Sequence, residues 1–249
     1  MKKLMLSIVA VLLFLAGTTF AQTAPAKFRV HEHVVKPSMN SKFRDAVKKL
    51  KAACEQYKLN LSWTTVGYDD NSYIHALPLQ NYADLDKNPF ADLETKMGQE
   101  ALGKIWGEMA ECLESERDYV ITSLPQFAYL TRGAEENHRE VTFWYILPGK
   151  DGEAENVLAE WKKLNESKKV PGGYEVYKAI FGIESRYAIV HFAKDAVDLA
   201  TKNQKTNELN AGEEANALWT KTMAISKRYF NKRGNVQPDL SLNLPKRKM

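Results

Sequence analysis

The sequence predicts an α+β protein in which one β-α-β-β-α-β unit occurs twice. The segment 30–130 has a weaker copy in the segment 141–244, and strand-type and helix-type apolar spacings alternate in the same order in both. The recurring pairs, 111 to 115 positions apart, are Pro37 and Pro148, Gly67 and Gly182, Tyr73 and Tyr187, Trp106 and Trp219, and Pro125 and Pro238. A nearly constant offset with small drifts is typical of a duplication followed by changes in loop length.

The first copy begins with a strand over residues 28–36, which is rich in β-branched residues and alternates in polarity. Pro37 starts a helix whose apolar residues follow a spacing of three and four as far as Tyr57. Strands are expected at 59–67 and 72–79, around a turn at 68–71. A second helix carries apolar positions from Leu93 to Leu113, and a last strand is expected at 126–131.

The second copy repeats this order of elements. A strand is expected at 141–147, followed by a helix with apolar positions from Ala154 to Leu164. Two more strands are expected at 174–181 and 186–193, and a second helix from Leu209 to Met223. Leucines alternate with polar residues in an expected closing strand at 240–244. The two repeats are therefore expected over residues 28–132 and 140–245.

This order of elements is the split β-α-β, or ferredoxin-like, unit, in which both helices cover one face of a four-stranded antiparallel sheet. The other face of each sheet is left bare, and two copies cover both bare faces by placing their sheets face to face. The layout resembles the dimeric α/β-barrel superfamily, which includes antibiotic-biosynthesis monooxygenase-like and NIPSNAP-like proteins. The segment 29–37 resembles the opening strand and proline of those domains. The resemblance implies a dimeric α/β barrel formed within one chain.

Residues 1–21 have the order of a secretory signal peptide. Lys2 and Lys3 precede an apolar stretch at 4–16, and small residues at 19 and 21 predict cleavage before Gln22. The alternative, an uncleaved anchor, is less favoured because the apolar stretch is shorter than the ~20 residues that a membrane span needs. We therefore expect a periplasmic or secreted protein without a stable membrane anchor.

The charge balance argues against a nucleic-acid-binding protein. The formal charge of +4 falls to +2 when Lys2 and Lys3 are removed with the signal peptide. Nucleic-acid-binding proteins usually carry a concentrated basic face. We therefore expect a small-molecule ligand as the partner and no nucleic acid, while the sequence leaves the oligomeric state open.

Two pairs of helix residues are expected in the apolar cores. Cys54 and Cys112 are the only cysteines, and each comes late in its helix. Because the two helices of one unit run antiparallel, the thiols should lie at opposite ends, so we predict two buried free thiols. Trp106 and Trp219 recur at matched helical positions, which favours core packing.

Four of the five histidines are expected to face the interior of the barrel. Side chains alternate between the two faces of a strand, so Arg29, His31 and His33 share one face of the first strand. The remaining residues expected to face inwards are Tyr73 and His75 in the first copy, and Tyr187 and His191 in the second. The residues expected to face the helices are Val30, Val34, Ile74, Ala76, Ala188, Val190 and Phe192. One chamber lined by both copies would follow.

Three functions are compatible with such a chamber. The first is binding of an organic molecule, with ligand contacts from Arg29, Trp63, Tyr73, Trp144, Lys178, Tyr187 and His191. The candidate catalytic residues are His31, His33 and His75, because an imidazole exchanges protons near neutral pH. The resemblance implies an aromatic or polyketide-like compound and a cofactor-independent oxygenase or isomerase.

The alternative function is a haem- or metal-binding barrel. His31, His33 and His75 are the candidate ligands, since imidazole suits zinc, copper and iron, and relatives in the superfamily include haem proteins. Neither haem nor a transition metal is required by the sequence. A second alternative is a structural or interaction module without a pocket, in which the histidines only bond to their neighbours.

The two copies differ at the candidate positions. His31 and His33 correspond to Thr142 and Trp144, and His75 corresponds to Ile189. Any site is therefore expected to be asymmetric, with the first copy supplying most of its polar groups. A duplicated chain can specialise one half in this way, whereas a homodimer cannot.

Overall fold

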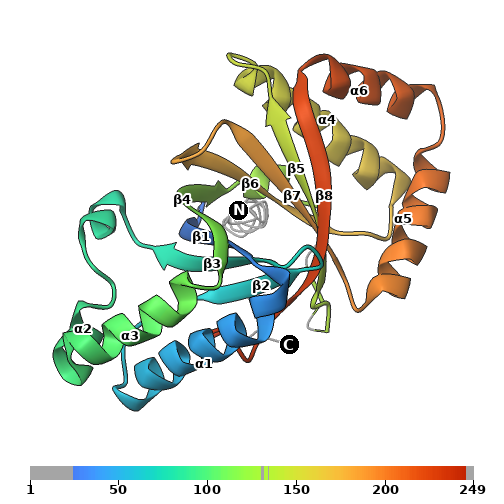
Figure 1. Ribbon diagram of the computed structural model, residues 1–249. Coiled ribbons are helices and arrows are strands. Elements are labelled where there is room, and N and C mark those ends of the chain that lie inside the picture. Colours follow the sequence, from blue (N-terminus) through green and yellow to red (C-terminus); the bar gives the residue numbers. More distant parts are fainter. Residues whose placement is uncertain (1–24, 130–131, 134, 245–249) are drawn as a thin grey trace, which may run out of the picture.

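Each repeat supplies four strands to one closed antiparallel barrel, which confirms the predicted tandem α+β architecture (Figure 1). The computed structural model describes residues 25–129, 132–133 and 135–244, so the predicted signal peptide lies outside the described residues. The first repeat contains β1 (Lys27–Val35), α1 (Asn40–Gln56), β2 (Thr64–Tyr68), β3 (Ser72–Leu79), α2 (Ala91–Met97), α3 (Gln99–Ala110) and β4 (Leu113–Ser123). The second contains β5 (His138–Ile146), α4 (Asp151–Lys168), β6 (Tyr174–Phe181), β7 (Arg186–Ala193), α5 (Ala196–Asn210), α6 (Glu213–Ala224) and β8 (Ser226–Val236).

The strand order around the barrel is β1-β3-β2-β8-β5-β7-β6-β4. Within each repeat the order is that of a ferredoxin-like sheet, β4-β1-β3-β2 in the first and β8-β5-β7-β6 in the second. The repeats join where β2 pairs with β8 and where β4 pairs with β6. Both joints are short: residues 120–123 of β4 pair with β6, and residues 234–236 of β8 pair with β2.

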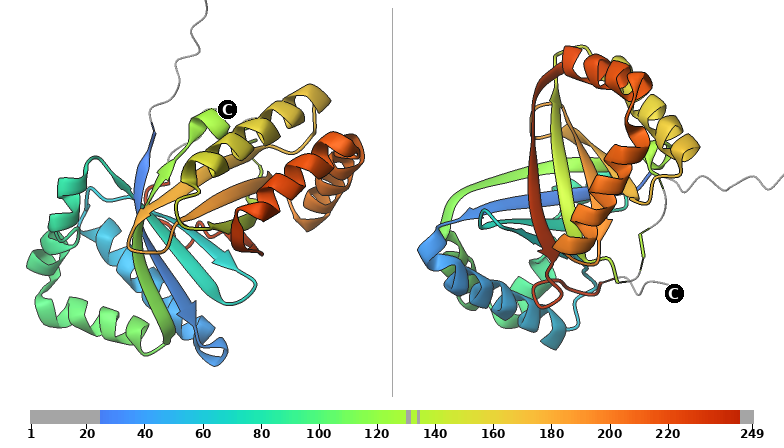
Figure 2. Two further views of the ribbon diagram at one scale, coloured as in Figure 1. Left: turned by 90° about the horizontal axis from the view of Figure 1, so that it is seen from above. Right: turned by 90° about the vertical axis from the view of Figure 1, so that its right-hand side faces the viewer.

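The helices form two layers on opposite outer sides of the barrel (Figures 1 and 2). Helices α1 to α3 cover the sheet of the first repeat, and α4 to α6 cover that of the second. A short 3₁₀ turn at Pro37–Met39 leads into α1, as the proline predicted. The expected apolar face of α1 is buried against the sheet, including Phe43, Val47 and Leu50. The helix-covered side of each sheet therefore has its own apolar core.

The second helix of each repeat is broken in two, where the sequence predicted a single helix. The break lies at Gly98 in the first repeat, with φ of 91°, and at Gly212 in the second, with φ of 146°. Positive φ is readily adopted only by glycine, so the chain turns at this position and begins a new helix. The two breaks lie 114 positions apart, which is a further trace of the duplication.

The predicted last strand of each repeat is wrong. The observed strands are β4 and β8, whereas 125–127 form a 3₁₀ turn and 130–131 lie outside the described residues. β4 and β8 are rich in exposed charged residues, so their apolar alternation is weak, and hydrogen bonds from neighbouring strands hold them in place. The leucines of the C-terminal segment, residues 237–244, instead pack on the first repeat: Leu240 is buried there, and Leu242 pairs with Trp63.

The two faces of the strands point in the opposite directions from those predicted: the face expected to lie under the helices lines the barrel interior. Ile74, Ala188 and Val190, expected to face the helices, pack with Phe143 and Tyr145 in the barrel interior. The histidines of the first repeat face the helices instead, as the contact between His33 and Phe43 of α1 shows. The inversion has a physical reason. Glu32 shares a face with Val30 and Val34, and a carboxylate can be buried in the barrel because Arg186 and Tyr119 bond to it there.

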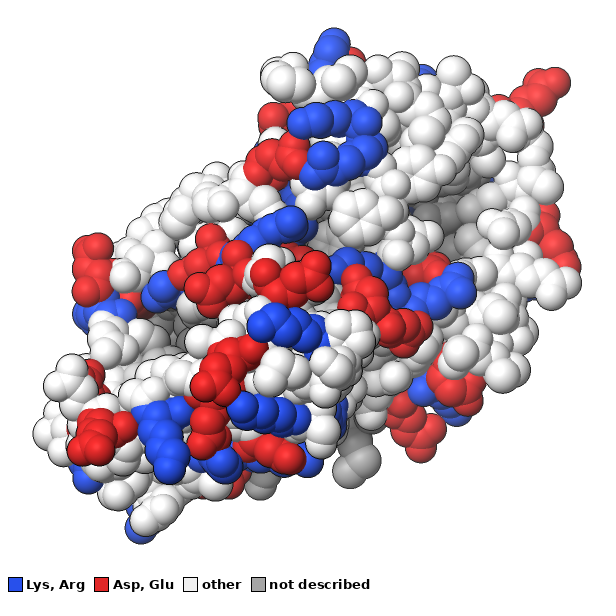
Figure 3. Space-filling model, viewed as in Figure 1, with Lys and Arg blue, Asp and Glu red and all other residues white. Residues whose placement is uncertain are grey.

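Cys54 and Cys112 are buried free thiols, as predicted. In the part of the chain that the structure describes, no helix is both long and apolar enough to span a bilayer. Lys and Arg side chains interleave with Asp and Glu on the face in Figure 3. Many of these charges are paired, as in the exposed bridge of 2.6 Å between Lys42 and Glu111.

Candidate functional site

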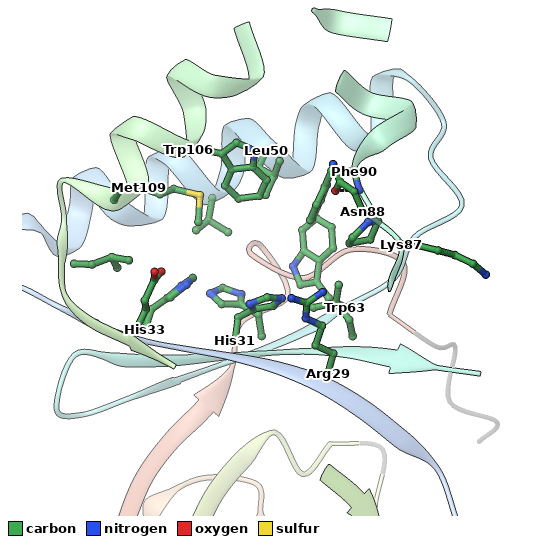
Figure 4. Close-up of a pocket in the computed structure, with 17 residues that line it drawn as sticks. Arg29, His31, His33, Leu50, Trp63, Lys87, Asn88, Phe90, Trp106 and Met109 are labelled. Atoms are coloured by element: carbon green, nitrogen blue, oxygen red, sulfur yellow. Dashed lines mark hydrogen bonds between the residues drawn. The ribbon is translucent and has the colours of Figure 1, made fainter. Parts of the chain in front are cut away.

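A cavity of about 540 Å³ lies between the sheet of the first repeat and the helices that cover it (Figure 4). Ligand pockets typically enclose ~300–1,000 Å³. The helical wall of the cavity is apolar and contains Val47, Leu50, Trp106 and Met109. The strand side carries a mixed set of polar and apolar residues: Arg29, His31, His33, Trp63, His75, Leu77, Leu113 and Glu116. The cavity thus sets an apolar wall against a floor of three imidazoles.

The segment before α2 closes one side of the cavity. In Figure 4, Asn88 and Phe90 lie at the cavity edge, whereas Lys87 points outwards. The ring of Phe90 contacts Trp106 edge-on at a centroid distance of 5.1 Å and lies 6.4 Å from Trp63. These three rings offer a surface on which a planar apolar molecule can pack.

Two of the histidines belong to a row that crosses the whole sheet of the first repeat. His31 of β1 is paired with Asp118 of β4 on one side and with His75 of β3 on the other. His75 is paired in turn with Thr65 of β2. Directly paired residues project from the same face of a sheet. Strand register therefore brings together Asp118, His31, His75 and Thr65 on the helix-covered side.

Two buried imidazole nitrogens of this floor have no hydrogen-bond partner among the residues that the structure describes. They are Nε2 of His75 and Nδ1 of His33, whose ring centroids lie 5.2 Å apart. His75 is only 7% exposed, and its other nitrogen, Nδ1, lies 2.9 Å from Thr65 Oγ1. Buried polar groups in native proteins are nearly always bonded, so such nitrogens mark positions where a bound group can complete the bonding.

Burial keeps the three imidazoles neutral near pH 7. Loss of solvent, with a smaller contribution from nearby His31, lowers the pKa of His33 to about 4. Burial and the other two imidazoles hold the pKa of His75 well below its usual value. Burial also lowers the pKa of His31, although the carboxylate of Asp118 opposes this shift. Neutral imidazoles can accept a hydrogen bond or ligate a metal without first losing a proton.

Arg29, which lines the cavity, forms an ion pair with Asp118. Arg29 Nε donates to Asp118 Oδ2 at 2.9 Å, and Asp118 Oδ1 lies 3.9 Å from His31 Nδ1. Strand register places Asp118 beside His31 and Glu116 beside His33, and both carboxylates act to raise the pKa of His31 against the larger effect of burial. A carboxylate favours the protonated form of a neighbouring imidazole, so His31 is the best placed of the three to take up a proton.

No group of three or more His, Cys, Asp or Glu side chains within the described ranges is arranged to hold a metal ion. His31, His33 and His75 share one cavity floor, but they do not converge on a point in this way. The three histidines were the candidate metal ligands of the alternative function.

The predicted ligand-binding residues do not meet in one chamber. Arg29 and Trp63 line the cavity with the three histidines. Tyr73 lies beside it, packed on Phe43 at 5.0 Å, and its hydroxyl donates to Asn40 Oδ1 at 2.7 Å. The remaining four, all in the second repeat, are Trp144, Lys178, Tyr187 and His191.

Those four residues have structural partners of their own. Trp144 packs against Tyr187 at 5.7 Å. Lys178 Nζ lies 2.9 Å from carboxylate oxygens of both Asp151 and Glu155. The ring of His191 packs on Tyr174 at 5.4 Å. The chamber shared by both repeats was expected only because the facing of the strands was predicted the wrong way round.

In the second repeat, two indoles occupy positions that correspond to the cavity. Strand register makes Trp144 the counterpart of His33, since each pairs with the matching tyrosine of the next strand. Trp161, which lies 111 positions after Leu50, packs against the same core. Trp144 Nε1 donates to Ser226 Oγ at 2.7 Å, and Trp161 Nε1 donates to Thr222 Oγ1 at 3.0 Å. The smaller side chains of the first repeat leave a cavity at these positions, whereas the larger indoles of the second repeat fill the same positions.

Several residues of the cavity were not predicted from sequence. Trp106, assigned to core packing, lines the cavity, and its counterpart Trp219 is 47% exposed. The contrast between Leu50 and Trp161 at a constant offset was a signal for the cavity wall. Thr65, which contacts His75 but does not itself line the cavity, had no sequence signal, because its contact depends on the register between strands.

No family profile matches this sequence, and no curated protein matches it. Solved structures do match. An anthrone oxidase-like protein superposes with a TM-score of 0.60 at 14% identity, covering 85% of this chain and 91% of that one. A mutant chlorite dismutase from Candidatus Nitrospira defluvii gives 0.53 at 10% identity, covering 86% and 92%. A Lactobacillus acidophilus protein, provisionally described as a monooxygenase, gives 0.50 at 12% identity, covering 88% and 95%. The chain therefore has the fold of the dimeric α/β barrels, with both halves in one polypeptide.

Proposed function

We propose that this chain is an exported barrel protein that binds a small aromatic or polyketide-like molecule in the cavity of the first repeat. The observation that carries the proposal is an apolar cavity whose floor holds two buried imidazole nitrogens without partners. An apolar wall with a few polar groups is the usual composition of a small-molecule site. The cavity also favours ligand binding over a pocketless interaction module.

The aromatic wall supports a planar ligand. Trp63, Phe90 and Trp106 provide stacking and edge contacts, and the opposing imidazoles provide hydrogen bonds. The names of the structural neighbours, an anthrone oxidase-like protein and a provisional monooxygenase, are consistent with such a ligand. Arg29 also lines the cavity and offers a positive charge to a polar group of the molecule.

Chemistry on the bound molecule would begin with proton transfer to His31. His33, with a pKa near 4, is too weak a base for this step, whereas His31 has Asp118 beside it. Isomerisation needs only that the proton return to another atom of the substrate. Oxygenation of a CH₂ group to a carbonyl consumes one O₂ and releases one water, with the substrate carbanion supplying the electrons. Both are compatible with a cofactor-independent oxygenase or isomerase.

A haem-binding barrel is the second candidate, favoured by the same unpartnered nitrogens. A neutral, buried imidazole can ligate iron, so His75 or His33 would hold the haem, and Arg29 would offer a positive charge to its carboxylates. Haem would supply redox chemistry at the iron. Adding haemin to the purified protein tests this candidate: a Soret band that is lost in both His33→Ala and His75→Ala would favour it over the organic ligand.

The main proposal is tested with 1-naphthol, a planar probe with one hydroxyl group. Isothermal titration calorimetry is expected to show one binding site per chain, because the second repeat has indoles where the first has its cavity. His33→Ala is expected to weaken binding. A protein that releases no binding heat, and whose tryptophan fluorescence the probe leaves unchanged, would contradict the proposal.

Export is a separate part of the proposal and rests on the basic, apolar and small-residue order of positions 1–21. Expression of the full chain in a Gram-negative host, followed by cell fractionation, tests it. The mature protein is expected in the periplasm or medium, with Gln22 as its first residue by mass spectrometry. Retention in the cytoplasm at full length would contradict it.

A further inference from the structure

We propose that Thr65 is a positioning residue that fixes the tautomer of His75, so that the cavity selects ligands that donate a hydrogen bond. The part about the tautomer stands on the contacts of Thr65 alone. The part about selectivity rests on the proposed ligand-binding function.

The argument begins with the single proton of the Thr65 hydroxyl. Thr65 Oγ1 lies 3.0 Å from the carbonyl oxygen of Leu240 and 2.9 Å from Nδ1 of His75. A carbonyl oxygen carries no proton, so the hydroxyl must donate to Leu240. Its lone pairs then accept a hydrogen bond from His75. Nδ1 of His75 therefore carries a proton.

A neutral imidazole has only one N–H group. Burial and the neighbouring imidazoles keep the pKa of His75 low, so the ring does not gain a second proton near pH 7. With the proton on Nδ1, Nε2 presents a bare lone pair. That nitrogen has no hydrogen-bond partner within the described part of the chain, and the ring of His75 lines the cavity. A ligand hydroxyl or N–H can complete this bond, whereas a carbonyl, ether or carboxylate oxygen would oppose it.

Thr65 is itself held by the C-terminal segment of the second repeat. Its backbone N–H donates to Ser241 Oγ at 2.9 Å, and the Leu240 carbonyl also accepts from Trp63 Nε1 at 2.7 Å. Thr65 and Leu240 are both buried. The hydroxyl thus has little freedom to turn away from the carbonyl, and residues far apart in sequence set the protonation pattern of the site.

The second repeat provides an internal comparison. Val176 pairs with Ile189 in the same register in which Thr65 pairs with His75. Both members of the polar pair are thus replaced by apolar residues in the repeat where indoles pack the matching positions. The hydroxyl and the imidazole are present together or absent together, as expected if they act as a unit.

Nitrogen-15 NMR of the histidine rings tests the tautomer at pH 7. The wild-type protein is expected to show His75 protonated at Nδ1. Thr65→Val keeps the side-chain shape but removes the acceptor, so the proton is expected to move to Nε2, and Thr65→Ser is expected to restore the wild-type pattern. An unchanged backbone amide spectrum verifies the fold of each variant. A His75 ring that stays protonated at Nδ1 in Thr65→Val would overturn the role of Thr65.

Selectivity is tested by calorimetry with 1-naphthol and 1-methoxynaphthalene. In the second probe a methyl group replaces the hydroxyl proton, so this probe cannot donate a hydrogen bond. Wild type is expected to prefer 1-naphthol by about tenfold, the value of one hydrogen bond. Thr65→Val is expected to lose most of this preference, and Thr65→Ser to keep it. Equal affinity of the wild type for both probes would overturn the selectivity. Binding of neither probe would refute the proposed function, while the NMR result would still decide the role of Thr65.

Discussion

Glu32 of the first repeat and Arg186 of the second meet inside the barrel, where Arg186 Nη2 lies 3.4 Å from Glu32 Oε2. Their side chains are only 6% and 3% exposed. The guanidinium lies over the rings of Tyr119 and Phe143, at 4.6 and 4.7 Å from their centroids, and the Tyr119 hydroxyl donates to the same Glu32 oxygen at 3.1 Å. A buried ion pair with added bonds therefore links the two halves of the chain.

Removing Glu32 is expected to destabilise the barrel strongly. Glu32→Ala leaves the guanidinium of Arg186 buried without its carboxylate, and loss of one partner of a buried pair costs about 3–5 kcal/mol. Lys42→Ala is the matched control, because Lys42 and Glu111 form an exposed pair whose loss should change stability little. Urea unfolding measures both. Similar losses of unfolding free energy in the two variants would show that the buried pair has no special role.

The stability of the protein is expected to fall as the pH falls from about 6.5 to about 4. The pKa of His33 is lowered from 6.5 to about 4 in the folded state. In that interval the unfolded chain binds a proton that the folded chain does not, so acidification favours unfolding. His33→Gln removes this titration, and its unfolding free energy should fall less over the same interval. Parallel pH profiles for wild type and variant, measured by urea unfolding, would contradict the assignment.

Leu50→Trp is expected to close the cavity. The substitution reproduces in the first repeat the indole that Trp161 supplies in the second. Affinity for 1-naphthol should fall at least about tenfold, with little loss of stability because the indole enters existing space. The control is Val197→Trp, which adds an indole at a position that is 75% exposed. If Leu50→Trp binds the probe as tightly as this control, the ligand lies elsewhere.

Gly234→Ala is expected to disrupt one of the two seams between the repeats. Gly234 of β8 is paired with Tyr68 of β2, and a Cβ atom on it would overlap the carbonyl oxygen of Gly67. Because the obstacle is backbone, the strands must separate, and we expect a loss of at least about 2 kcal/mol in unfolding free energy. Gly103→Ala, in α3 with open space around it, should instead stabilise by about 0.5–1 kcal/mol. Equal thermal midpoints for the two variants would argue against a tight seam.

Much of the architecture could be predicted because it depends on local patterns. The offset between Pro37 and Pro148 indicated the duplication, and the three- and four-residue spacing after Pro37 predicted α1. The turn before Ser72 was predicted by its polar residues. The correspondence of His33 with Trp144, expected from the offset, is confirmed by strand register. Repeats, helices and tight turns are encoded by residues close together in the sequence.

The candidate site could be predicted only in part. The alternation of β1 placed Arg29, His31 and His33 on one face, and register with β3 adds His75. Alternation defines two faces of a strand, but it does not say which one is turned to the helices. The face of β1 that carries Glu32 is turned into the barrel, where Glu32 bonds to Arg186, a partner 154 positions away.

The sequence by itself determined that two related sheets are made and which side chains share a face. Tertiary structure alone decided that those imidazoles lie under α1 and α3, that the C-terminal segment reaches Thr65 through Leu240, and that a cavity remains in the first repeat. The physical reason is that the burial of a charge, and the packing of helix side chains over a sheet, depend on groups from distant segments. No local sequence pattern specifies those groups.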